Sequence, residues 1–503
     1  MKTRTLYLIN NKKTTLLLIF ISVHFSSSAQ SYSGYQSTAY SGVYGILNSP
    51  ADILNHRVRG DLNLVGISTA VGNNIITFRY NKIDSDKGAV TFPNPIKRNG
   101  KMNLNLDVFG PSLLIRLNDK NAIALTTRAR VMANLRGADD LLLNSLLQET
   151  VPNELIGSTL NIHDMSVNAH AWKEVALTYS RQIGISDYGV WKFGASLKYL
   201  GGMAAFSLRT NKLSFVHDSI FDASTGGMRD AILSPRGNIN LGYTKNLDSL
   251  SDGLSDYLRF KNPGLGLDIG ISYEYRDEMQ VYGTAYSEKT ANYIWKAGAS
   301  ITDIGYIRYP KQQTKGIATK FAGNNYTVDQ LDPPSDSSDI YQMANYYKKL
   351  FNAGSEPPLI TMQLPTTLHL SYDRYFNKWL GIQGQLNIPL MFSRVNYYTG
   401  NYNPVSLVVT PRAEIPQAGL YVPLTYSVGA GFQMGAALRL GPLTIGSASL
   451  INTRIFSNTK AADFYFILRI PFFGYREYED HDEKQQRPKL TRKQRRKLDC
   501  PAN

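Results

Sequence analysis

The chain has almost no cysteine. Its 503 residues include a single one, Cys500, so no disulfide can form within the chain. Charge is also scarce, since 18% of the residues are charged and 43% are hydrophobic, and such a chain is too apolar to be disordered. A soluble protein of this length would divide into several domains, but no Pro/Ser-rich linker and no internal repeat of fixed period is found. These absences favour one large folded unit.

Long apolar runs are missing after residue 30. No stretch there reaches the roughly 20 residues that a transmembrane helix needs. The N-terminus carries basic residues, a short apolar run from Leu16 to Phe25 and small residues before Gln30, which predicts a secretory signal peptide over residues 1–29. A membrane anchor is the alternative, but the run is too short to span a bilayer. We therefore expect an exported chain, either soluble or spanning a membrane as a β-barrel.

Motifs of enzyme chemistry are missing as well. The seven histidines show no HExxH spacing, and one cysteine cannot complete a metal-binding set. We find no GxSxG nucleophile elbow and no phosphate-binding P-loop. The sequence therefore predicts neither an enzyme nor a protein with a cofactor or a metal ion.

What the sequence does contain is alternation with a period of two. In PGLGLDIGISYEYR (263–276) every second residue from Leu265 to Tyr275 is apolar or aromatic, and the residues between them are small, polar or charged. The stretch TTLHLSYDRYFNKWLGIQGQLNI (366–388) repeats the pattern on both sides of a short turn. A soluble β-sandwich also alternates. Long strands with aromatic ends and a polar second face, however, are typical of a barrel with lipid outside and water inside.

The pattern predicts an all-β fold, a closed transmembrane antiparallel β-barrel of about 14 strands over residues 61–475. Closure is required because an open edge in lipid would leave backbone groups unpaired. Short connections are expected at one end of the barrel. Long connections are expected at the other end, over residues 135–168, 217–236, 246–262 and 310–361. Two of these carry helical patterns, at 139–148 and 339–351, and we expect each to pack over or into the barrel mouth.

Ten charged residues fall on the inward phase of the predicted strands. They are Arg128, Arg130, Glu174, Lys192, Lys198, Asp268, Glu274, Lys296, Asp303 and Arg469. A basic lumen would favour anionic solutes, whereas ion pairs among these residues would hold a filled, closed barrel. The second interpretation is preferred because acids and bases share the same face.

One of these residues, Asp303, interrupts a strand. From Trp295 to Ile301 every second residue is apolar, and the next residue in that series is a carboxylate. A β-bulge at this point would shift the register, turn Asp303 toward the lumen and bring Tyr306 to the lipid face. The alternative is that the strand ends at Thr302.

Residues 476–503 form a charged tail. An acidic block is followed by eight basic residues, which are Lys484, Arg487, Lys489, Arg492, Lys493, Arg495, Arg496 and Lys497. Charge blocks of this kind are typical of interaction tails, and a merely solvated tail is the alternative. Export argues against nucleic acid, and an even strand number places the tail in the periplasm. The expected partners are an envelope protein complex, peptidoglycan or anionic lipid headgroups.

Four segments together resemble a family of Bacteroidota outer-membrane β-barrels that is broadly similar to the FadL and PorV group. They are SPADILNHR (49–57), PGLGLDIGISYEYR (263–276), KAGASITDIGYIRY (296–309) and LPTTLHLSYDRYF (364–376). The resemblance implies a barrel of about 14 strands whose N-terminal segment, residues 30–60, folds into the lumen as a hatch. Asn48-Ser49-Pro50-Ala51 stands where FadL-like proteins carry Asn-Pro-Ala, with Ser49 as an extra residue.

Three classes of function remain open. The preferred one is a structural or accessory subunit of an envelope complex for secretion, protein assembly or cell-wall anchoring, because a hatch and internal ion pairs argue against an open pore. The alternative, which the resemblance suggests, is a FadL-like passive transporter of hydrophobic or anionic small molecules. An outer-membrane enzyme has the least support. In every case we expect the chain in the outer membrane, in contact with its lipid.

Overall fold

The computed structural model describes most of the chain between residues 31 and 471. The described ranges are 31–36, 38–54, 60–75, 77–79, 90–91, 100–118, 120–138, 157, 159–162, 164–186, 189–222, 226–247, 261–276, 293–331, 340–354, 360–377, 379–390, 398–455 and 458–471. The predicted signal peptide, the charged tail with its eight basic residues and the predicted helix at 139–148 lie outside the described residues.

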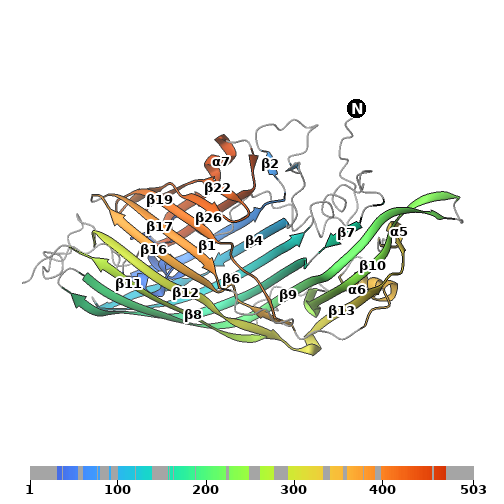
Figure 1. Ribbon diagram of the computed structural model, residues 1–503. Helices are drawn as coiled ribbons and strands as arrows, with labels where there is room; N and C mark the ends of the chain where they lie inside the picture. The colour runs from blue at the N-terminus through green and yellow to red at the C-terminus, as the bar shows by residue number, and fades with distance from the viewer. Residues whose placement is uncertain are drawn as a thin grey trace, which may run out of the picture.

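Fourteen antiparallel strands close into a barrel (Figure 1). The first strand, β1, pairs on one side with β4 and β5 and on the other side with the last strand, β26, so the sheet closes on itself. Some strands are interrupted and carry two labels. In order around the wall they are β1 (Gly60–Asn73), β4 (Gly100–Phe109) with β5 (Ser112–Asn118), β6 (Asn121–Ala138), β8 (Ser166–Ser186), β9 (Gly189–Asp222), β11 (Pro263–Tyr275), β12 (Trp295–Tyr309), β15 (Ile360–Gln363) with β16 (Thr367–Tyr375), β17 (Leu380–Pro389), β19 (Ser406–Glu414), β20 (Ala418–Tyr421) with β21 (Leu424–Ser427), β22 (Gly431–Met434) with β23 (Ala436–Leu440), β24 (Leu443–Ser447) and β26. The last of these spans Ala461–Pro471. The predicted fold class and strand number are confirmed.

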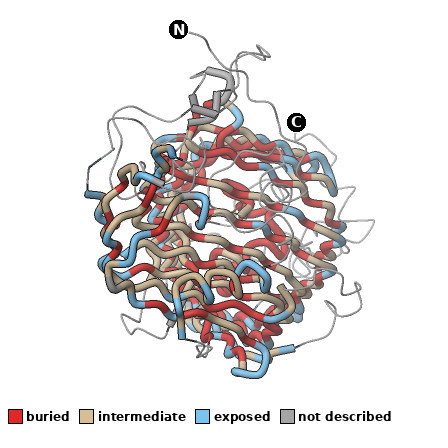
Figure 2. Tube along the Cα trace, turned by 90° about the vertical axis from the view of Figure 1, so that its right-hand side faces the viewer, coloured by how far each residue is buried: buried red, intermediate tan, exposed pale blue. Residues whose placement is uncertain are grey.

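The wall has apolar side chains outside and polar side chains inside. On β11, Leu265 is 66% exposed whereas Asp268 is 2% exposed, and buried and exposed residues alternate along the strands in Figure 2. A soluble protein shows the reverse arrangement. The pattern is therefore that of a barrel with hydrocarbon outside. Among the described residues, no helix is long and apolar enough to cross a bilayer.

The strand around Asp303 contains the predicted β-bulge. The pairing of β12 with β11 shifts between Leu267 and Ile269, so that Thr302 and Asp303 both stand opposite Asp268. Asp303 has a φ of 59°, the left-handed conformation that one type of bulge requires. Its backbone N–H donates to Asp268 Oδ1 at 2.7 Å. The bulge is thus held by the carboxylate that faces it.

Beyond the bulge the side chains change face, as predicted. Asp303 is 5% exposed and lines the lumen, while Tyr306 is 47% exposed on the outer surface. The strand continues to Tyr309. The alternative that it ends at Thr302 is therefore wrong.

The two ends of the barrel differ in their connections. Short turns join β5 to β6, β16 to β17 and β23 to β24 at one end, here called the short-turn end. Most long connections lie at the opposite, long-loop end. The connection of residues 276–294 departs from the expectation, because it is long and yet joins β11 to β12 at the short-turn end.

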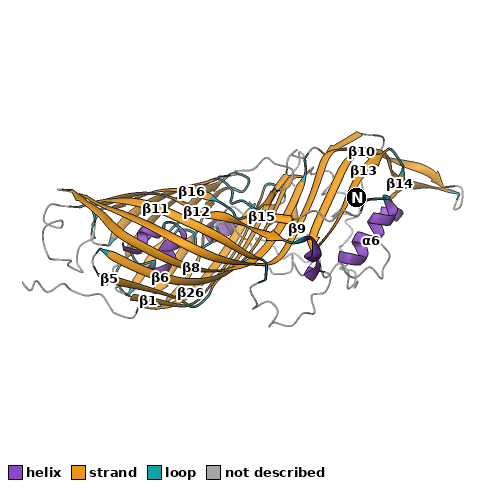
Figure 3. Cartoon of the chain, turned by 90° about the horizontal axis from the view of Figure 1, so that it is seen from below, coloured by secondary structure: helices purple, strands orange, loops and turns teal. Residues whose placement is uncertain are grey.

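At the long-loop end the sheet continues beyond the barrel as an extension (Figures 1 and 3). The second half of β9 leaves β11 and pairs with β10 (Gly227–Thr244), which pairs in turn with β13 (Thr314–Ala322) and β14 (Tyr326–Thr327). The strand β7 (Thr159–Ile162) pairs with β9 on its other side. The predicted loop at 217–236 is therefore wrong, since most of it forms a β9–β10 hairpin. The prediction of a long loop at 310–361 is also wrong in part, because the described residues of that stretch include the strands β13 and β14 and several helices.

The predicted helix at 339–351 is confirmed as α6 (Ile340–Leu350). Ala344 of this helix belongs to one buried cluster with Tyr243 of β10 and Ile317 of β13. The helix therefore packs on the extension (Figure 3) and not over the barrel mouth as expected. The remaining elements are η4 (Lys245–Leu247), η5 (Lys311–Gln313), α5 (Val328–Leu331), β18 (Tyr398–Gly400), α7 (Leu450–Ile455) and a small sheet of β2 (Thr77–Arg79), β3 (Val90–Thr91) and β25 (Asn458–Thr459).

Candidate functional site

Residues 31–36 and 38–54, here called the luminal segment, lie inside the barrel (Figure 3). The segment contains two 3-10 helices, η1 (Gly42–Leu47) and η2 (Pro50–Leu54). Its side chains Tyr32, Tyr35 and Tyr44 are fully buried and belong to one apolar cluster with wall residues such as Phe109 and Tyr465. The segment thus fills part of the bore with an apolar core of its own.

Polar contacts tie the luminal segment to strands on different sides of the wall. They are Val43 N–H to Asp61 Oδ2 on β1 (2.8 Å), Ser180 Oγ on β8 to the carbonyl of Ala51 (3.3 Å), Lys296 Nζ on β12 to Asp52 Oδ1 (3.2 Å) and Tyr465 hydroxyl on β26 to the carbonyl of Ser33 (3.1 Å). Because these strands surround the bore, the bonds fix the segment across it.

Two glycines of the wall make room for the luminal segment. A Cβ atom on Gly194 would lie 2.3 Å from the carbonyl carbon of Pro50, and a Cβ atom on Gly270 would lie 2.3 Å from Ser49 Oγ. Neither position accepts a side chain without moving the segment. The Asn-Ser-Pro-Ala sequence, singled out by resemblance, therefore docks where the wall has no side chains.

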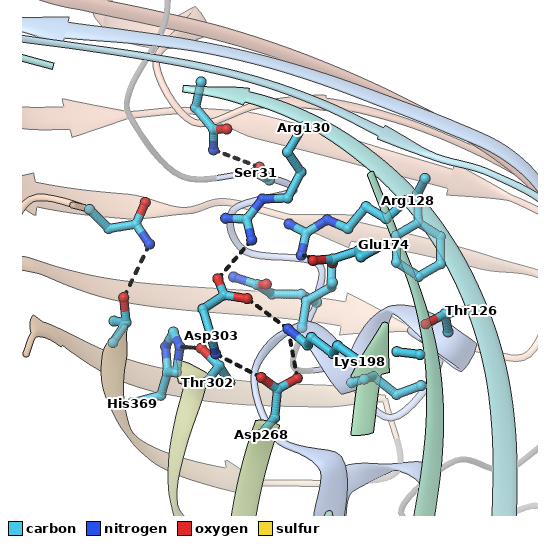
Figure 4. A pocket seen from close by; sticks show the side chains of 18 of the residues that line it. Ser31, Thr126, Arg128, Arg130, Glu174, Lys198, Asp268, Thr302, Asp303 and His369 are labelled. Carbon is cyan, nitrogen blue, oxygen red and sulfur yellow. Dashed lines mark hydrogen bonds and ion pairs between the residues drawn. The ribbon is translucent and has the colours of Figure 1, made fainter. Parts of the chain in front are cut away.

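Seven charged side chains form what we call the mid-lumen cluster, which is shown in part in Figure 4. Asp303 of β12 lies at its centre and contacts both Arg130 of β6 and Lys198 of β9. The contacts are Arg130 Nη1 to Asp303 Oδ2 (2.7 Å), Lys198 Nζ to Asp303 Oδ1 (2.6 Å) and to Asp268 Oδ2 (2.9 Å), Arg128 Nη1 to Glu174 Oε1 (3.4 Å), and Arg128 to Asp107. All seven side chains are at most 9% exposed.

The other four predicted lumen residues lie nearer the short-turn end and are also paired. The pairs are Lys192 with Glu274 (2.6 Å), Lys296 with Asp52 (3.2 Å) and Arg469 with Asp61 (2.9 Å), and Arg276 also contacts Glu274. Each of the ten predicted residues thus contacts an opposite charge. The lumen is lined by ion pairs and not by an excess of cations.

Several members of these networks are not among the ten residues predicted from the sequence. They are Asp52, Asp61, Asp107, Arg276, Asp373, Arg412 and Glu414, of which Arg412 contacts Asp373 at 2.7 Å and Glu414 at 2.9 Å. The alternation along β19 would have found Arg412 and Glu414, since they share a phase with Thr410. Asp52 carries no such signal, because it belongs to the luminal segment.

A second segment crosses the lumen toward the long-loop end. Residues 398–404, here called the strap, begin with β18, which pairs in parallel with β15, and then reach β6. Asn401 Nδ2 donates to the carbonyl of Met132 at 2.6 Å. The amide of Asn134 donates to the carbonyl of Tyr402 at 3.1 Å and accepts from its N–H at 3.0 Å.

The strap spans the full width of the barrel. It leads into β19, and six strands separate β19 from β6 in either direction around the wall. The guanidinium of Arg136 lies 4.7 Å from the centre of the Tyr402 ring. Burial raises the pKa of the Tyr402 phenol.

A cavity of about 70 Å³ lies between the luminal segment and the strap (Figure 4). Ser31 and Gln36 line it from the luminal segment, and Asn403 lines it from the strap. The mid-lumen cluster contributes three cations and three carboxylates to its wall: Arg128, Arg130, Lys198, Glu174, Asp268 and Asp303. Within the described part of the chain, no group of three or more His, Cys, Asp or Glu side chains is placed to hold a metal ion.

A closed barrel with an apolar outer surface, a polar lumen and a chain segment inside it defines the class of outer-membrane β-barrels. Residues 50–448 match a family described as a family of unknown function (DUF5723), and because the match covers more than half of the chain, the chain belongs to this family. A comparison with curated proteins gives no match.

Solved structures of similar fold include several transporters. The TodX deltaS2S3 mutant monoaromatic hydrocarbon channel has 8% identity, covers 89% of this chain and 99% of its own, and gives a TM-score of 0.40. The Ralstonia pickettii toluene transporter TbuX has 8% identity, 89% and 97% coverage and a TM-score of 0.31. A Pseudomonas aeruginosa FadL homologue has 9% identity, 89% and 98% coverage and a TM-score of 0.24.

Proposed function

We propose that this chain is an outer-membrane channel protein for small polar solutes, closed by its own luminal segment and strap. The observation that carries the proposal is the cavity between two chain segments that cross the bore and are held there by side-chain contacts. The luminal segment contributes no strand to the wall, so its departure would leave the barrel ladders intact, whereas the strap pairs through β18 with β15.

The chemistry of the lumen favours small polar solutes over the hydrophobic or anionic molecules that were expected for a FadL-like transporter. An anion meets carboxylates as well as cations, because the charged side chains are paired. A hydrophobic molecule would have to pass the mid-lumen cluster, where it would strip polar groups of their partners without replacing them. A small solute with hydrogen-bonding groups avoids both costs.

The test is the swelling of proteoliposomes that contain the full chain. We expect slow entry of glycerol and urea through the wild-type protein, and entry at least several-fold faster after deletion of residues 31–54. Migration of the unheated barrel on a detergent gel checks that the deletion variant is folded. If the folded deletion variant admits no solute, the channel proposal is wrong.

An accessory role is a second candidate, because the extension carries an exposed apolar pair. Phe221 and Met228 face each other across the β9–β10 hairpin and are 66% and 65% exposed. Exposed apolar side chains on a projecting hairpin fit contact with another envelope protein, and the basic tail would add a second contact in the periplasm. Co-purification from solubilised membranes that is lost on deleting residues 217–232 or 476–503 would support this role.

A further inference from the structure

We propose that the cavity is a binding chamber for a small zwitterion of the amino-acid type. This inference rests on the proposed channel function and names the class of solute. Three observations carry it, which are the size of the cavity, the balance of charges in its wall and two lining side chains that each carry a buried polar atom without a hydrogen-bond partner among the described residues.

The size of the cavity limits the solute. A buried water needs about 10–15 Å³ of such space, so a cavity of about 70 Å³ holds roughly five non-hydrogen atoms. Glycine has about this number. The luminal segment and the strap border the cavity on opposite sides, so a larger solute would displace one of them.

The charges of the wall favour a solute without net charge. Three cationic and three anionic side chains line the cavity, and each is already paired. A single ion would add an unmatched charge among buried side chains, which is strongly unfavourable. A zwitterion adds one charge of each sign and can place each beside its opposite.

Two side chains that line the cavity offer groups for the two ends of such a solute. Arg130 Nε is a charged donor and Asn105 Oδ1 is an acceptor; both atoms are buried, and neither has a hydrogen-bond partner among the residues that the structure describes. Both residues line the cavity and are only 3% and 4% exposed. Because buried polar atoms are nearly always paired, these two atoms point to a carboxylate at Arg130 and an ammonium group at Asn105.

Trp172 provides a reporter inside the barrel. Its ring is fully buried, the guanidinium carbon of Arg130 lies 4.7 Å from the ring centre, and its Nε1 donates to Glu174 Oε2 at 3.3 Å. Trp191 and Trp379, by contrast, are 43% and 50% exposed on the outer surface. A ligand on Arg130 should therefore change the emission of Trp172.

The experiment uses the full chain in detergent micelles, with glycine as the probe. Equilibrium dialysis with labelled glycine measures binding, and tryptophan emission reports its place. We expect saturable glycine binding, with at least ten-fold weaker binding of acetate, methylammonium and glycerol. Absence of glycine binding, or equal binding of acetate or glycerol, overturns the proposal.

Substitutions test whether glycine binds in the chamber or elsewhere in the lumen. Arg130→Gln keeps a hydrogen-bonding side chain but removes the charge, and we expect glycine to bind at least ten-fold more weakly. Asn105→Ala removes the acceptor and should weaken binding several-fold. Arg412→Gln is the matched control, because Arg412 is a buried arginine of another network that does not line the cavity. Wild-type affinity in both cavity variants overturns the proposal.

Failure of this inference can be told from failure of the channel function. If the protein binds no glycine but proteoliposomes that contain it admit urea, the channel proposal stands and the chamber proposal is wrong. If the protein binds glycine but its folded deletion variant admits no solute, the chamber proposal is supported and the channel proposal is wrong.

Discussion

Arg130 on β6 and Asp303 on β12 form an ion pair across the lumen, with Nη1 2.7 Å from Oδ2, although β8, β9 and β11 separate the two strands along the wall. Neighbouring strands lie about 4.8 Å apart, so the path along the wall is roughly 19 Å. The two side chains therefore meet inside the bore, across the arc of wall that these three strands form. Asp303 faces the lumen only because the bulge shifts the register of β12.

The charge of Asp303 is expected to stabilise the barrel. Asparagine tolerates a positive φ almost as well as aspartate, so Asp303→Asn keeps the bulge and removes only the charge from Arg130 and Lys198. Breaking a buried ion pair on one side costs about 3–5 kcal/mol. We expect a loss of this order in the free energy of unfolding, measured by urea titration in micelles.

The control for this prediction is Asp329→Asn. Asp329 pairs with Arg229 at 3.3 Å, but the two side chains are 72% and 37% exposed. An exposed pair contributes only about 0–1 kcal/mol. Equal losses in the two variants would show that the mid-lumen cluster is accessible to water and not part of a closed lumen.

Gly194→Ala should release the luminal segment without altering it. The new methyl group would lie 2.3 Å from the carbonyl carbon of Pro50 and 2.4 Å from the nitrogen of Ala51, and this backbone must move away. Overpacking costs about 1–3 kcal/mol, which raises the population of the released form roughly 5- to 150-fold while it is the minor form. Urea entry into proteoliposomes measures the change.

Gly384→Ala is the matched change in a place with room. The nearest atom to its new methyl group is the carbonyl oxygen of Tyr372 at 4.0 Å. Solute entry through this variant should equal that of the wild type. If both alanine variants speed entry alike, the effect comes from the wall and not from the luminal segment.

Asn134→Ala should loosen the strap. It removes two hydrogen bonds to the backbone of Tyr402, each contributing about 0.5–1.5 kcal/mol. A cysteine introduced as Asn403→Cys, in a Cys500→Ser background, reports access to the cavity by its rate of reaction with a water-soluble thiol reagent. We expect a rate roughly 5- to 150-fold higher in the loosened protein.

Asn168→Ala provides the comparison for the strap. Its amide reaches the strap only once, at 3.5 Å from the carbonyl of Gly400, so its loss should change the reaction rate much less. An unchanged rate in Asn134→Ala would mean that the strap does not control access to the cavity.

The boundary between lipid and water can be tested with one substitution at two sites. Leu177 on β8 is 52% exposed on the wall, and Met228 on the extension is 65% exposed. Arginine at mid-membrane on a barrel wall costs about 2–4 kcal/mol. Leu177→Arg should make folding into vesicles less favourable by this amount, and Met228→Arg should leave the free energy of folding nearly unchanged. Similar effects at both sites would contradict a hydrocarbon-covered wall.

The sequence alone determined the wall and the face on which each of its residues lies. Alternation is a local property, because side chains in a strand point to opposite sides in turn. For the same reason the slip at Asp303 could be recognised within a few residues. Helix α6 followed from its own local pattern, although the surface that it covers did not.

The extension could not be foreseen from the sequence. Residues 217–236 do not show the lipid-facing alternation of the barrel strands, because a sheet that projects into water needs no continuous apolar face. A polar hairpin therefore resembles a loop until its partners are known. Only the pairing of β9 with β10, and of β10 with β13, makes it a sheet.

The partners of the charged residues and the closures of the lumen were decided by the tertiary structure. The pair Arg130 and Asp303 is 173 residues apart in the chain, and the contact of Asn134 with Tyr402 spans 268 residues. A period of two indicates that such side chains point inward, but it carries no information on what lies opposite. That depends on the strand number and stagger with which the sheet closes, since closure brings distant strands to face each other across the bore.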